Sequence, residues 1–308
     1  MQVAFLIASL LGCNEFGFDP IDREAPPADR LVEEVFVQAP LPAVDLLFVL
    51  DATPSMTQEY ELLRSSVDEL MGQLDAAELR WQIGAVGANM GAADAGLLRG
   101  RPWVVTPDTP EREQAVASLM GASPVPGDEA GLAAAHEALR QSEPGGGNEG
   151  FRRPGALLHV VFVSDADDAS DPWLADPVVA VIEALNDTPS GAVASALVGD
   201  VPGGCTSPRG TAQAGHRYVE VAEATGGVVA SICEADFAHM MGDIGAGSVV
   251  LPAEFLLREA PRQEAVTVLV DDEPVTAFEL RSDPPAIRFD QAPAASSRIV
   301  VTYSVSNQ

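Results

Sequence analysis

The chain has 308 residues, of which 46 are acidic and 17 are basic, and its formal net charge is −29. Phosphate backbones and anionic membrane surfaces repel a chain this acidic, so the composition argues against nucleic-acid binding. The hydrophobic content of 47% and the length allow one large or two modest domains with a sizeable core.

The N-terminus predicts an exported protein. The apolar run at residues 3–12 is too short to span a membrane but suits the core of a signal peptide. It ends in the sequence LLGC, which resembles a bacterial lipobox, so we expect a signal peptide at residues 1–12 and a lipid on Cys13. Residues 1–3 carry no Lys or Arg, which leaves an ordinary cleaved signal or a start further upstream as alternatives. The expected location is the cell envelope, at the outer membrane, or the medium if the lipobox interpretation is wrong.

Residues 13–43 are predicted to be a lipid-anchored tether that ends in an edge strand. The Pro-rich, acidic sequence at residues 21–30 is typical of an extended linker. The sequence VEEVFVQ at residues 32–38 predicts an edge strand leading into the first domain.

Residues 44–246 are predicted to form an α/β domain. The near-continuous apolar run at residues 44–50 indicates a strand buried on both faces, and such strands belong to parallel sheets covered by helices. The pattern therefore predicts a doubly wound, mostly parallel sheet. Further strands are expected at residues 81–86, 102–106, 156–164, 192–198 and 228–233, and helices at residues 58–74, 110–120, 130–141, 178–185, 218–224 and 237–244.

Residues 247–308 change pattern. Residues 265–275, 286–290 and 297–305 alternate apolar and polar side chains, with Pro and Asp turn signals between them. This predicts a small β-rich C-terminal appendage, with no chemistry of its own.

The first strand ends in a short loop that carries Asp51, Thr53 and Ser55. In an open parallel sheet, ligands bind just beyond the carboxyl ends of the strands. A carboxylate and two hydroxyls are hard oxygen donors, which suit Mg²⁺, Ca²⁺ or Mn²⁺ better than zinc. The loop therefore predicts a divalent-cation site.

These residues resemble the von Willebrand factor type A domain with its metal-ion-dependent adhesion site. That family carries D-x-S-x-S after its first strand, and Thr53 here takes the place of the first Ser while keeping a hydroxyl. The segment ALLHVVFVSDADDAS at residues 156–170 looks like the family's fourth strand, ending in its second metal-site aspartate at Asp165. The resemblance covers about residues 32–246 and is close to exported or lipid-anchored bacterial members without an assigned activity.

The resemblance implies a function and a metal site. Thr53 and Ser55 would contact Mg²⁺, or Ca²⁺ or Mn²⁺, directly, whereas Asp51 and Asp165 would act through water. The metal would bridge to an acidic residue of a protein partner. The expected function is a metal-dependent protein-binding module, for adhesion or envelope assembly, and not an enzyme.

Glu129 departs from the family pattern. The family supplies a Thr from a second loop in a G-x-T setting, and the matching stretch here is at residues 127–132, with Glu129 in that place. Its carboxylate could fill the coordination position that the family leaves open for a partner, or could point away. Our hypothesis is that the site binds metal more tightly and presents it less readily.

The loop after residue 164 holds the densest group of carboxylates in the chain. It lacks the Gly and the distal Glu of an EF-hand. Apart from Asp165, we expect Asp167, Asp168 and Asp171 to form a solvated acidic face.

Cys205 and Cys233 are predicted to form a disulfide, because disulfides persist in exported proteins. Two buried free thiols are the alternative.

Two other interpretations of the Asp51 loop remain open. The loop could be a relic that only caps the next helix, since Asp, Ser and Thr all do this. It could also hold an aspartate nucleophile for phosphoryl transfer, as in haloacid dehalogenase-type enzymes and response-regulator receivers. Thr53 stands where the hydrolases have an acid/base aspartate, and its hydroxyl is too weak an acid for that proton transfer.

The remaining motifs predict no chemistry. The G-x-G-x-x-G match at residues 145–150 follows a predicted helix instead of a strand, so we interpret it as a flexible connection. The four histidines, each standing alone in the sequence, are expected at the surface or in the core: His136, His159, His216 and His239.

Overall fold

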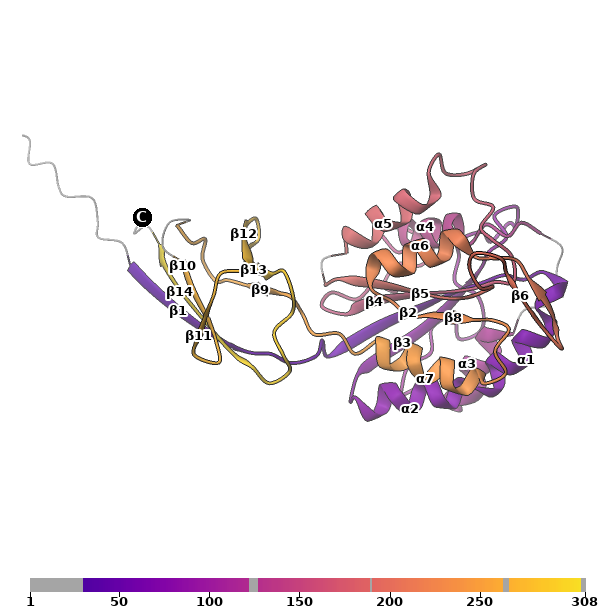
Figure 1. Ribbon diagram of the computed structural model, residues 1–308, viewed down its shortest axis with the longest axis horizontal. Helices are drawn as coiled ribbons and strands as arrows, with labels where there is room; N and C mark the ends of the chain where they lie inside the picture. The colour runs from indigo at the N-terminus through magenta and orange to yellow at the C-terminus, as the bar shows by residue number, and fades with distance from the viewer. Residues whose placement is uncertain (1–29, 122–126, 189, 263–265, 306–308) are drawn as a thin grey trace, which may run out of the picture.

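The protein, described by a computed structural model, contains an α/β unit and an antiparallel β-rich unit (Figure 1). The structure describes residues 30–121, 127–188, 190–262 and 266–305. The predicted signal peptide, the lipid site at Cys13 and the predicted tether up to residue 29 lie outside the described residues. Within the described ranges, no helix is both long and apolar enough to cross a membrane.

A five-stranded parallel sheet forms the centre of the α/β unit, with the order β3-β2-β4-β5-β8. Its strands are β2 (Ala43–Leu50), β3 (Arg80–Gly87), β4 (Leu157–Val163), β5 (Ala192–Val198) and β8 (Val229–Ser231). Side chains of β2 alternate between two cores: Leu46 and Phe48 face one, and Leu47 and Val49 face the other. All eight residues of β2 are buried, as the apolar run predicted.

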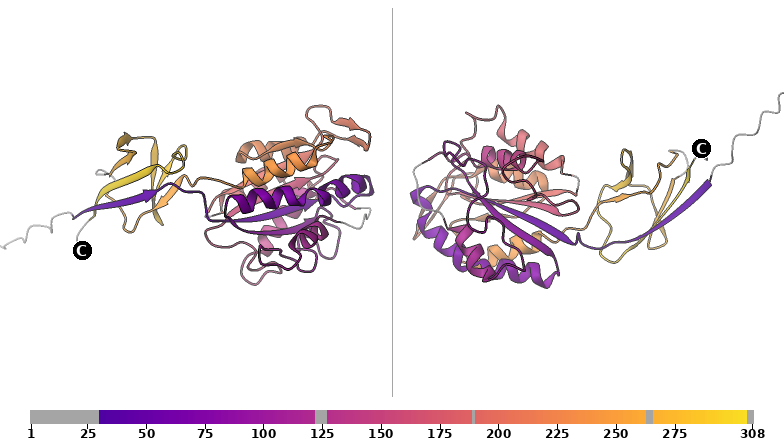
Figure 2. Two further views of the ribbon diagram at one scale, coloured as in Figure 1. Left: turned by 90° about the horizontal axis from the view of Figure 1, so that it is seen from below. Right: turned by 180° about the vertical axis from the view of Figure 1, so that it is seen from behind.

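Helices cover both faces of this sheet (Figures 1 and 2). One face carries η1 (Pro54–Met56), α1 (Thr57–Ser65), α2 (Val67–Ala76), α3 (Arg112–Met120) and α7 (Phe237–Gly247). The other face carries α4 (Gly131–Gln141), α5 (Pro177–Asn186) and α6 (His216–Thr225). The predicted fold class, a helix-covered parallel sheet with a β-rich C-terminal region, is therefore confirmed.

The single helix predicted at residues 58–74 is wrong, because the chain breaks at Ser66 into α1 and α2. Ser65 Oγ donates to the carbonyl of Leu62 at 2.9 Å, and Ser66 N–H donates to the carbonyl of Leu63 at 3.1 Å. Serine pairs bend helices because their hydroxyls compete for backbone partners.

The strand predicted at residues 102–106 is also wrong, since only Val105 pairs with the sheet. Its N–H and carbonyl exchange hydrogen bonds with Ile83 at 2.9 and 2.8 Å. Pro102 and Pro107 flank it, and proline has no N–H to extend a ladder.

The loop at residues 145–150 is fixed rather than flexible. Asn148 is 1% exposed, donates to the carbonyl of Gly96 at 2.8 Å and accepts from Leu98 N–H at 2.9 Å. The loop forms turns between α4 and β4, so it lacks the strand-to-helix setting of a nucleotide site.

Two antiparallel sheets pack into the β-rich unit around its own apolar core. One sheet has the order β1-β14-β10-β11 and the other β12-β13-β9. The strands are β1 (Arg30–Val37), β9 (Glu254–Leu256), β10 (Val266–Val270), β11 (Glu273–Val275), β12 (Phe278–Ser282), β13 (Pro285–Phe289) and β14 (Arg298–Val305). Within the segment where the alternating pattern predicted β structure, β10 and β11 form a hairpin that turns at Asp271 and Asp272, both with positive φ.

The α/β unit is inserted into the β-rich unit. Strand β1 precedes the α/β unit, yet it pairs with β14 along its whole length, from Arg30 opposite Val305 to Val37 opposite Arg298. The strand expected at residues 32–38 therefore exists, but as the edge of the β-rich sheet. It does not join the parallel sheet.

Two segments connect the units, residues 38–42 and 248–253, and they lie side by side (Figures 1 and 2). Leu41 N–H donates to the carbonyl of Val250 at 3.1 Å. Buried Gln38 donates through Nε2 to the carbonyls of Pro252 and Pro293, at 2.9 and 3.1 Å.

Candidate metal site

The candidate site lies where the strand order of the parallel sheet reverses. The chain leaves β2 for β3 on one side and later returns in β4 on the other. Ligands bind at such a switch point, outside the carboxyl ends of the strands. Asp51 follows β2 directly, Asp165 follows β4 by two residues, and Asp51 N–H donates to the carbonyl of Val163 at 3.0 Å. The topology thus brings together two acidic residues that are far apart in the sequence.

Three side-chain oxygens form a short row at this point. Thr53 Oγ1 and Ser55 Oγ are 2.9 Å apart, and Ser55 Oγ donates to Asp165 Oδ1 at 3.2 Å. An octahedral Mg²⁺ with oxygens at about 2.0–2.1 Å has neighbouring ligands about 2.9 Å apart. The spacing between the two hydroxyls therefore matches a pair of adjacent metal ligands.

Asp51 fixes the conformation of the loop through buried hydrogen bonds. It is 1% exposed; its Oδ1 accepts from Thr53 N–H at 2.8 Å, and its Oδ2 accepts from Ser164 Oγ at 2.7 Å. The hydroxyl of Tyr60 donates to its carbonyl oxygen. Both carboxylate oxygens of Asp51 already accept hydrogen bonds. Asp51 is therefore better placed to bind a water that coordinates the metal than to coordinate the metal directly.

The loop does not work as a simple helix cap. Neither η1 nor α1 has a side-chain hydrogen bond at its N-cap. The hydroxyls of Thr53 and Ser55 face each other and Asp165 instead. The capping role that the relic interpretation gave to these side chains is therefore not observed, whereas a degenerate metal site remains an alternative.

Negative charge is concentrated around the row of oxygens. Burial raises the pKa of Asp165; the hydrogen bond from Ser55 opposes this shift, and the charges of Asp51 and Glu59 add to it. Burial also raises the pKa of Glu129, and Asp51 and Asp165 raise it further. The carboxylates destabilise one another's charged forms, so a bound cation would relieve their repulsion.

Glu129 lies close enough to Asp51 and Asp165 to interact with both charges, and its backbone is held firmly. Its carbonyl accepts from Ala169 N–H at 3.0 Å and from the hydroxyl of Tyr218 at 3.4 Å. These bonds fix the start of α4 against the loop that carries Asp165.

Asp168 has a role that the sequence analysis missed. It is 7% exposed and accepts from Leu132 N–H at 2.9 Å, from Ser170 N–H at 3.0 Å and from Ser170 Oγ at 2.7 Å. Ser170 Oγ in turn accepts from Ala133 N–H at 2.8 Å. The expectation of a solvated face is wrong for Asp168, which satisfies the free N–H groups at the N-terminus of α4.

The other two carboxylates of this loop contact Arg217. Exposed Asp171 forms an ion pair with Arg217 at 2.8 Å, as expected for a surface residue. Half-buried Asp167 accepts from the backbone N–H of Arg217 at 3.1 Å. A sequence signal for Asp168 existed: Asp168-x-Ser170 repeats Asp51-x-Thr53, and in both pairs the carboxylate accepts the N–H two residues on.

The available side-chain donors determine which metal ions the site could bind. Among the residues that the structure describes, no three His, Cys, Asp or Glu side chains come close enough to hold a cation by themselves. A cation would therefore depend on the hydroxyls of Thr53 and Ser55 as well as on carboxylates. Such an all-oxygen set fits Mg²⁺, Ca²⁺ or Mn²⁺.

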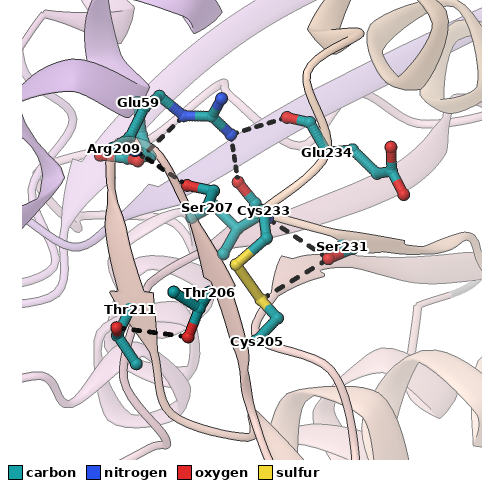
Figure 3. The surroundings of a disulfide bond; sticks show 10 residues. Glu59, Cys205, Thr206, Ser207, Arg209, Thr211, Ser231, Cys233 and Glu234 are labelled. Carbon is teal, nitrogen blue, oxygen red and sulfur yellow. Dashed lines mark hydrogen bonds and ion pairs between the residues drawn. A yellow bond between two sulfur atoms is a disulfide. The ribbon is translucent and has the colours of Figure 1, made fainter.

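A disulfide joins Cys205 and Cys233, as predicted, with their Cα atoms 6.1 Å apart. It ties the hairpin of β6 (Cys205–Ser207) and β7 (Gly210–Ala212) to the end of β8 (Figure 3). Arg209, at the turn of this hairpin, contacts Glu59 of α1 through Nε at 3.3 Å. Its Nη2 donates to the carbonyls of Ile232 and Glu234 at 3.0 and 2.7 Å. Disulfide and arginine together fix the hairpin beside Ser55 and Asp165, which share a cavity with it.

His159 belongs to the core, which was one of the two expected settings. Its ring lies between Ser248 Oγ and Ser195 Oγ, each 2.8 Å away, and its exposure is 0%. Burial lowers its pKa to about 4. The imidazole is therefore neutral and links β4, β5 and the end of α7.

The sequence matches no protein-family model, and no curated protein matches it either. Solved structures are similar at low identity. Proximal thread matrix protein 1 from the mussel byssus, with a zinc-occupied MIDAS motif, is 14% identical over 70% of this chain and 47% of that chain, with a TM-score of 0.42. This chain thus spans about half the length of that protein.

Two bacterial structures are similar at the same level. The pilus adhesin SpaC from Lactobacillus rhamnosus GG, in an open conformation, is 13% identical over 92% of this chain and 41% of that chain, with a TM-score of 0.41. The conserved hypothetical protein BatB from Bacteroides thetaiotaomicron is 17% identical over 66% of this chain and 97% of that chain, with a TM-score of 0.40. These values are too low to assign the chain to a family.

Proposed function

We propose that this chain is a metal-dependent protein-binding module of the von Willebrand factor type A kind, displayed on the cell envelope for adhesion or envelope assembly. A divalent cation, Mg²⁺ or alternatively Ca²⁺ or Mn²⁺, binds at the loops after β2 and β4. There it bridges to a carboxylate of a protein partner.

The observation that carries this proposal is the row of oxygens from Thr53 to Ser55 to Asp165 at the switch point of the sheet. The two hydroxyls, 2.9 Å apart, are the direct ligands. Asp51 and Asp165 hold water ligands, and their charges attract the cation. The bound cation then offers a free position to an acidic side chain, since water ligands exchange readily with carboxylates.

Glu129 modifies this site. In the place where the family has a neutral Thr, it adds a third carboxylate near Asp51 and Asp165. The extra charge strengthens cation binding. It also competes with the carboxylate of the partner, so partner binding is weaker than with a neutral residue there.

The disulfide supports an exported location, because disulfides persist outside the reducing cytosol. Binding rather than catalysis is proposed, because Thr53 cannot serve as the acid/base of a phosphoryl-transfer enzyme.

Thermal unfolding with and without metal tests the proposal. Millimolar Mg²⁺ or Mn²⁺ should raise the Tm of the wild-type chain, since a ligand at about 100 times its Kd stabilises by about 2.7 kcal/mol. Ser55→Ala, at an exposed position, and Asp51→Ala should remove the metal effect. Asp171→Ala, which removes an exposed carboxylate from the same acidic loop, is the control and should keep it.

The opposite results would reject the metal site. An unchanged wild-type Tm at saturating Mg²⁺ and Mn²⁺, or an equal shift in Ser55→Ala, would do so. Metal-dependent release of phosphate from aryl phosphates, lost in Asp51→Ala, would favour the phosphoryl-transfer alternative.

A further inference from the structure

Strand β1 forms one edge of the four-stranded sheet in the β-rich unit (Figure 2). It pairs with β14 along its whole length, in a register without a bulge. Within the ranges that the structure describes, no other strand pairs with the opposite side of β1. That side is therefore a free sheet edge.

The hydrogen bonds at the end of the sheet show which backbone groups of β1 face the free edge. Gln38 N–H, which continues β1, donates to the carbonyl of Ser297 at 2.8 Å. Asp271 N–H, which continues β10, donates to the carbonyl of Arg298 at 2.8 Å. Successive residues of a strand direct these groups to opposite sides, so the even-numbered residues of β1 bond to β14. The N–H and carbonyl groups of residues 31, 33, 35 and 37 consequently point to the free edge.

The same four residues place their side chains on the outer face of the sheet, away from the core. Leu31, Val35 and Val37 are 70%, 49% and 66% exposed. Exposed Glu33 lies between Leu31 and Val35. Unpaired backbone groups and exposed apolar side chains therefore occur together on one strand.

The other edges of the β-rich unit are protected against pairing, and β1 is not. Natural edge strands are typically short, bulged or interrupted by Pro or charged side chains. Strands β9 and β11 have only three residues each, and β11 contains Pro274. Strand β12 exposes Glu279 and Arg281. Strand β1 has eight residues, no bulge, no Pro and no Lys.

We propose that β1 is a docking surface that binds an extended strand of a different protein, which joins the sheet beside it. The free N–H and carbonyl groups bind the backbone of that strand. The exposed apolar side chains of β1 match apolar residues at alternate positions of the partner, and Glu33 matches a Lys or Arg opposite it. The docking surface lies in the β-rich unit and needs no cation, so the inference does not depend on the proposed metal site.

A second copy of this chain fits the same edge poorly. In the two longest antiparallel registers that keep the outer faces together, either Glu33 or Glu34 lies directly opposite the same residue of the other copy. Like charges directly opposite each other destabilise a sheet. The net charge of −29 on each copy adds repulsion, whereas it attracts a basic partner.

Hydrogen exchange of the full chain, followed by NMR in EDTA, is the first test. The amides of residues 31, 33, 35 and 37 should exchange quickly, whereas those of residues 32, 34 and 36 should be protected by β14. Slow exchange of the odd-numbered set in the monomer would show that the chain covers its own edge. Protection that rises with protein concentration would show that a second copy does. Either result would overturn the inference.

The second test is a titration with the peptide acetyl-VTVTKTV-amide, again in EDTA. In antiparallel pairing its Lys lies opposite Glu33, and its Val side chains lie opposite Val37, Val35 and Leu31. The peptide should slow exchange of the odd-numbered amides. A peptide with Glu in place of Lys should bind about fivefold more weakly, and Glu33→Lys should reverse this order. No protection by the Lys peptide, or equal binding of the two peptides to the wild type, would overturn the inference.

Val35→Pro tests the role of the free backbone. It removes an N–H that points to the free edge, so the bonds to β14 and the Tm should be kept. Binding of the Lys peptide should weaken by about fivefold, since one hydrogen bond is lost. Val35→Thr keeps this N–H and is the matched control, with binding within about twofold of the wild type. Equal binding by Val35→Pro and Val35→Thr would overturn the inference. Because all titrations are done in EDTA, their failure leaves the metal-dependent Tm result intact, and the reverse also holds.

Discussion

The carboxylate of Asp168 accepts a hydrogen bond from the backbone N–H of Leu132 at 2.9 Å, and this contact joins the acidic loop after β4 to the start of α4. Glu129 lies just before α4, so Asp168 sets the position of the residue that distinguishes the proposed metal site. We predict that Asp168→Asn lowers the free energy of unfolding by about 2 kcal/mol, since it weakens a buried cap and the bonds to Ser170. Urea unfolding measures this loss.

Asp171→Asn is the matched control, because it removes an exposed carboxylate three residues away. Exposed ion pairs such as the one between Asp171 and Arg217 contribute about 0–1 kcal/mol. Equal losses in the two variants would contradict the assignment of Asp168 as a buried cap.

The buried imidazole of His159 should make stability depend on pH. Its pKa is about 4 in the folded chain against 6.5 when unfolded, so below pH 6.5 only the unfolded chain takes up the proton. Stability from this group is therefore complete above pH 6.5 and is lost as pH falls toward 4. Between pH 7 and pH 5 the loss should be about 2 kcal/mol.

His159→Gln isolates this effect, because glutamine keeps polar contacts with Ser195 and Ser248 but does not titrate. The difference in unfolding free energy between wild type and variant should shrink by about 2 kcal/mol from pH 7 to pH 5. Parallel pH profiles for the two proteins would show that His159 does not cause the dependence.

Glu129→Thr introduces the residue that the von Willebrand factor type A pattern, which this sequence resembles, has at the matching position. We predict that Mg²⁺ affinity falls by about tenfold, since one nearby charge contributes about 1–2 kcal/mol to cation binding. Isothermal calorimetry measures the change, with Asp128→Asn as a control at an exposed neighbouring carboxylate. Unchanged affinity in Glu129→Thr would show that this carboxylate points away from the cation.

The disulfide should stabilise the α/β unit. Cys205 and Cys233 are separated by 28 residues, and the loop-entropy model gives about 3–4 kcal/mol for a loop of that size. We expect the double variant Cys205→Ala, Cys233→Ala to lose most of this. Thiol titration of the denatured wild type without reductant should find no reactive thiol from this pair, and two thiols per chain would refute the bridge.

The α/β architecture could be predicted because its signals are local. Strand β2 is apolar at nearly every position, and a strand that feeds two cores must be so. Helix α6 is followed by Gly226, whose φ of 74° forms a left-handed C-cap, a local feature that glycine adopts readily. The helix break at Ser66 was missed because apolar periodicity continues through that position.

The insertion of one unit into the other could not be predicted from local pattern. Strand β1 is rich in apolar residues, but nothing in its sequence says that its partner is β14, more than two hundred residues later. The pairing of β1 with β14 is explained by the fold, because Val32 and Phe36 pack against the apolar core of the β-rich unit.

The candidate site also has a part that could be predicted from local sequence and a part that could not. The residues of the two loops after β2 and β4 were foreseeable, because oxygen donors follow buried strands there. The supporting contacts were not, since Asp168 capping α4 and Arg209 contacting Glu59 both join segments that only the fold brings together.

The path of the backbone from β1 to Asp51 has a mechanical consequence. Strand β1 passes through the short segment 38–42 into β2, and β2 ends at the loop proposed to bind a metal. A pulling force between residue 30 and a bound partner would therefore act along strands that are already nearly extended. Such a backbone can lengthen very little under load. The helices of the α/β unit lie outside this path. The force would therefore load the contact between the loop and its partner before it unfolds the helices.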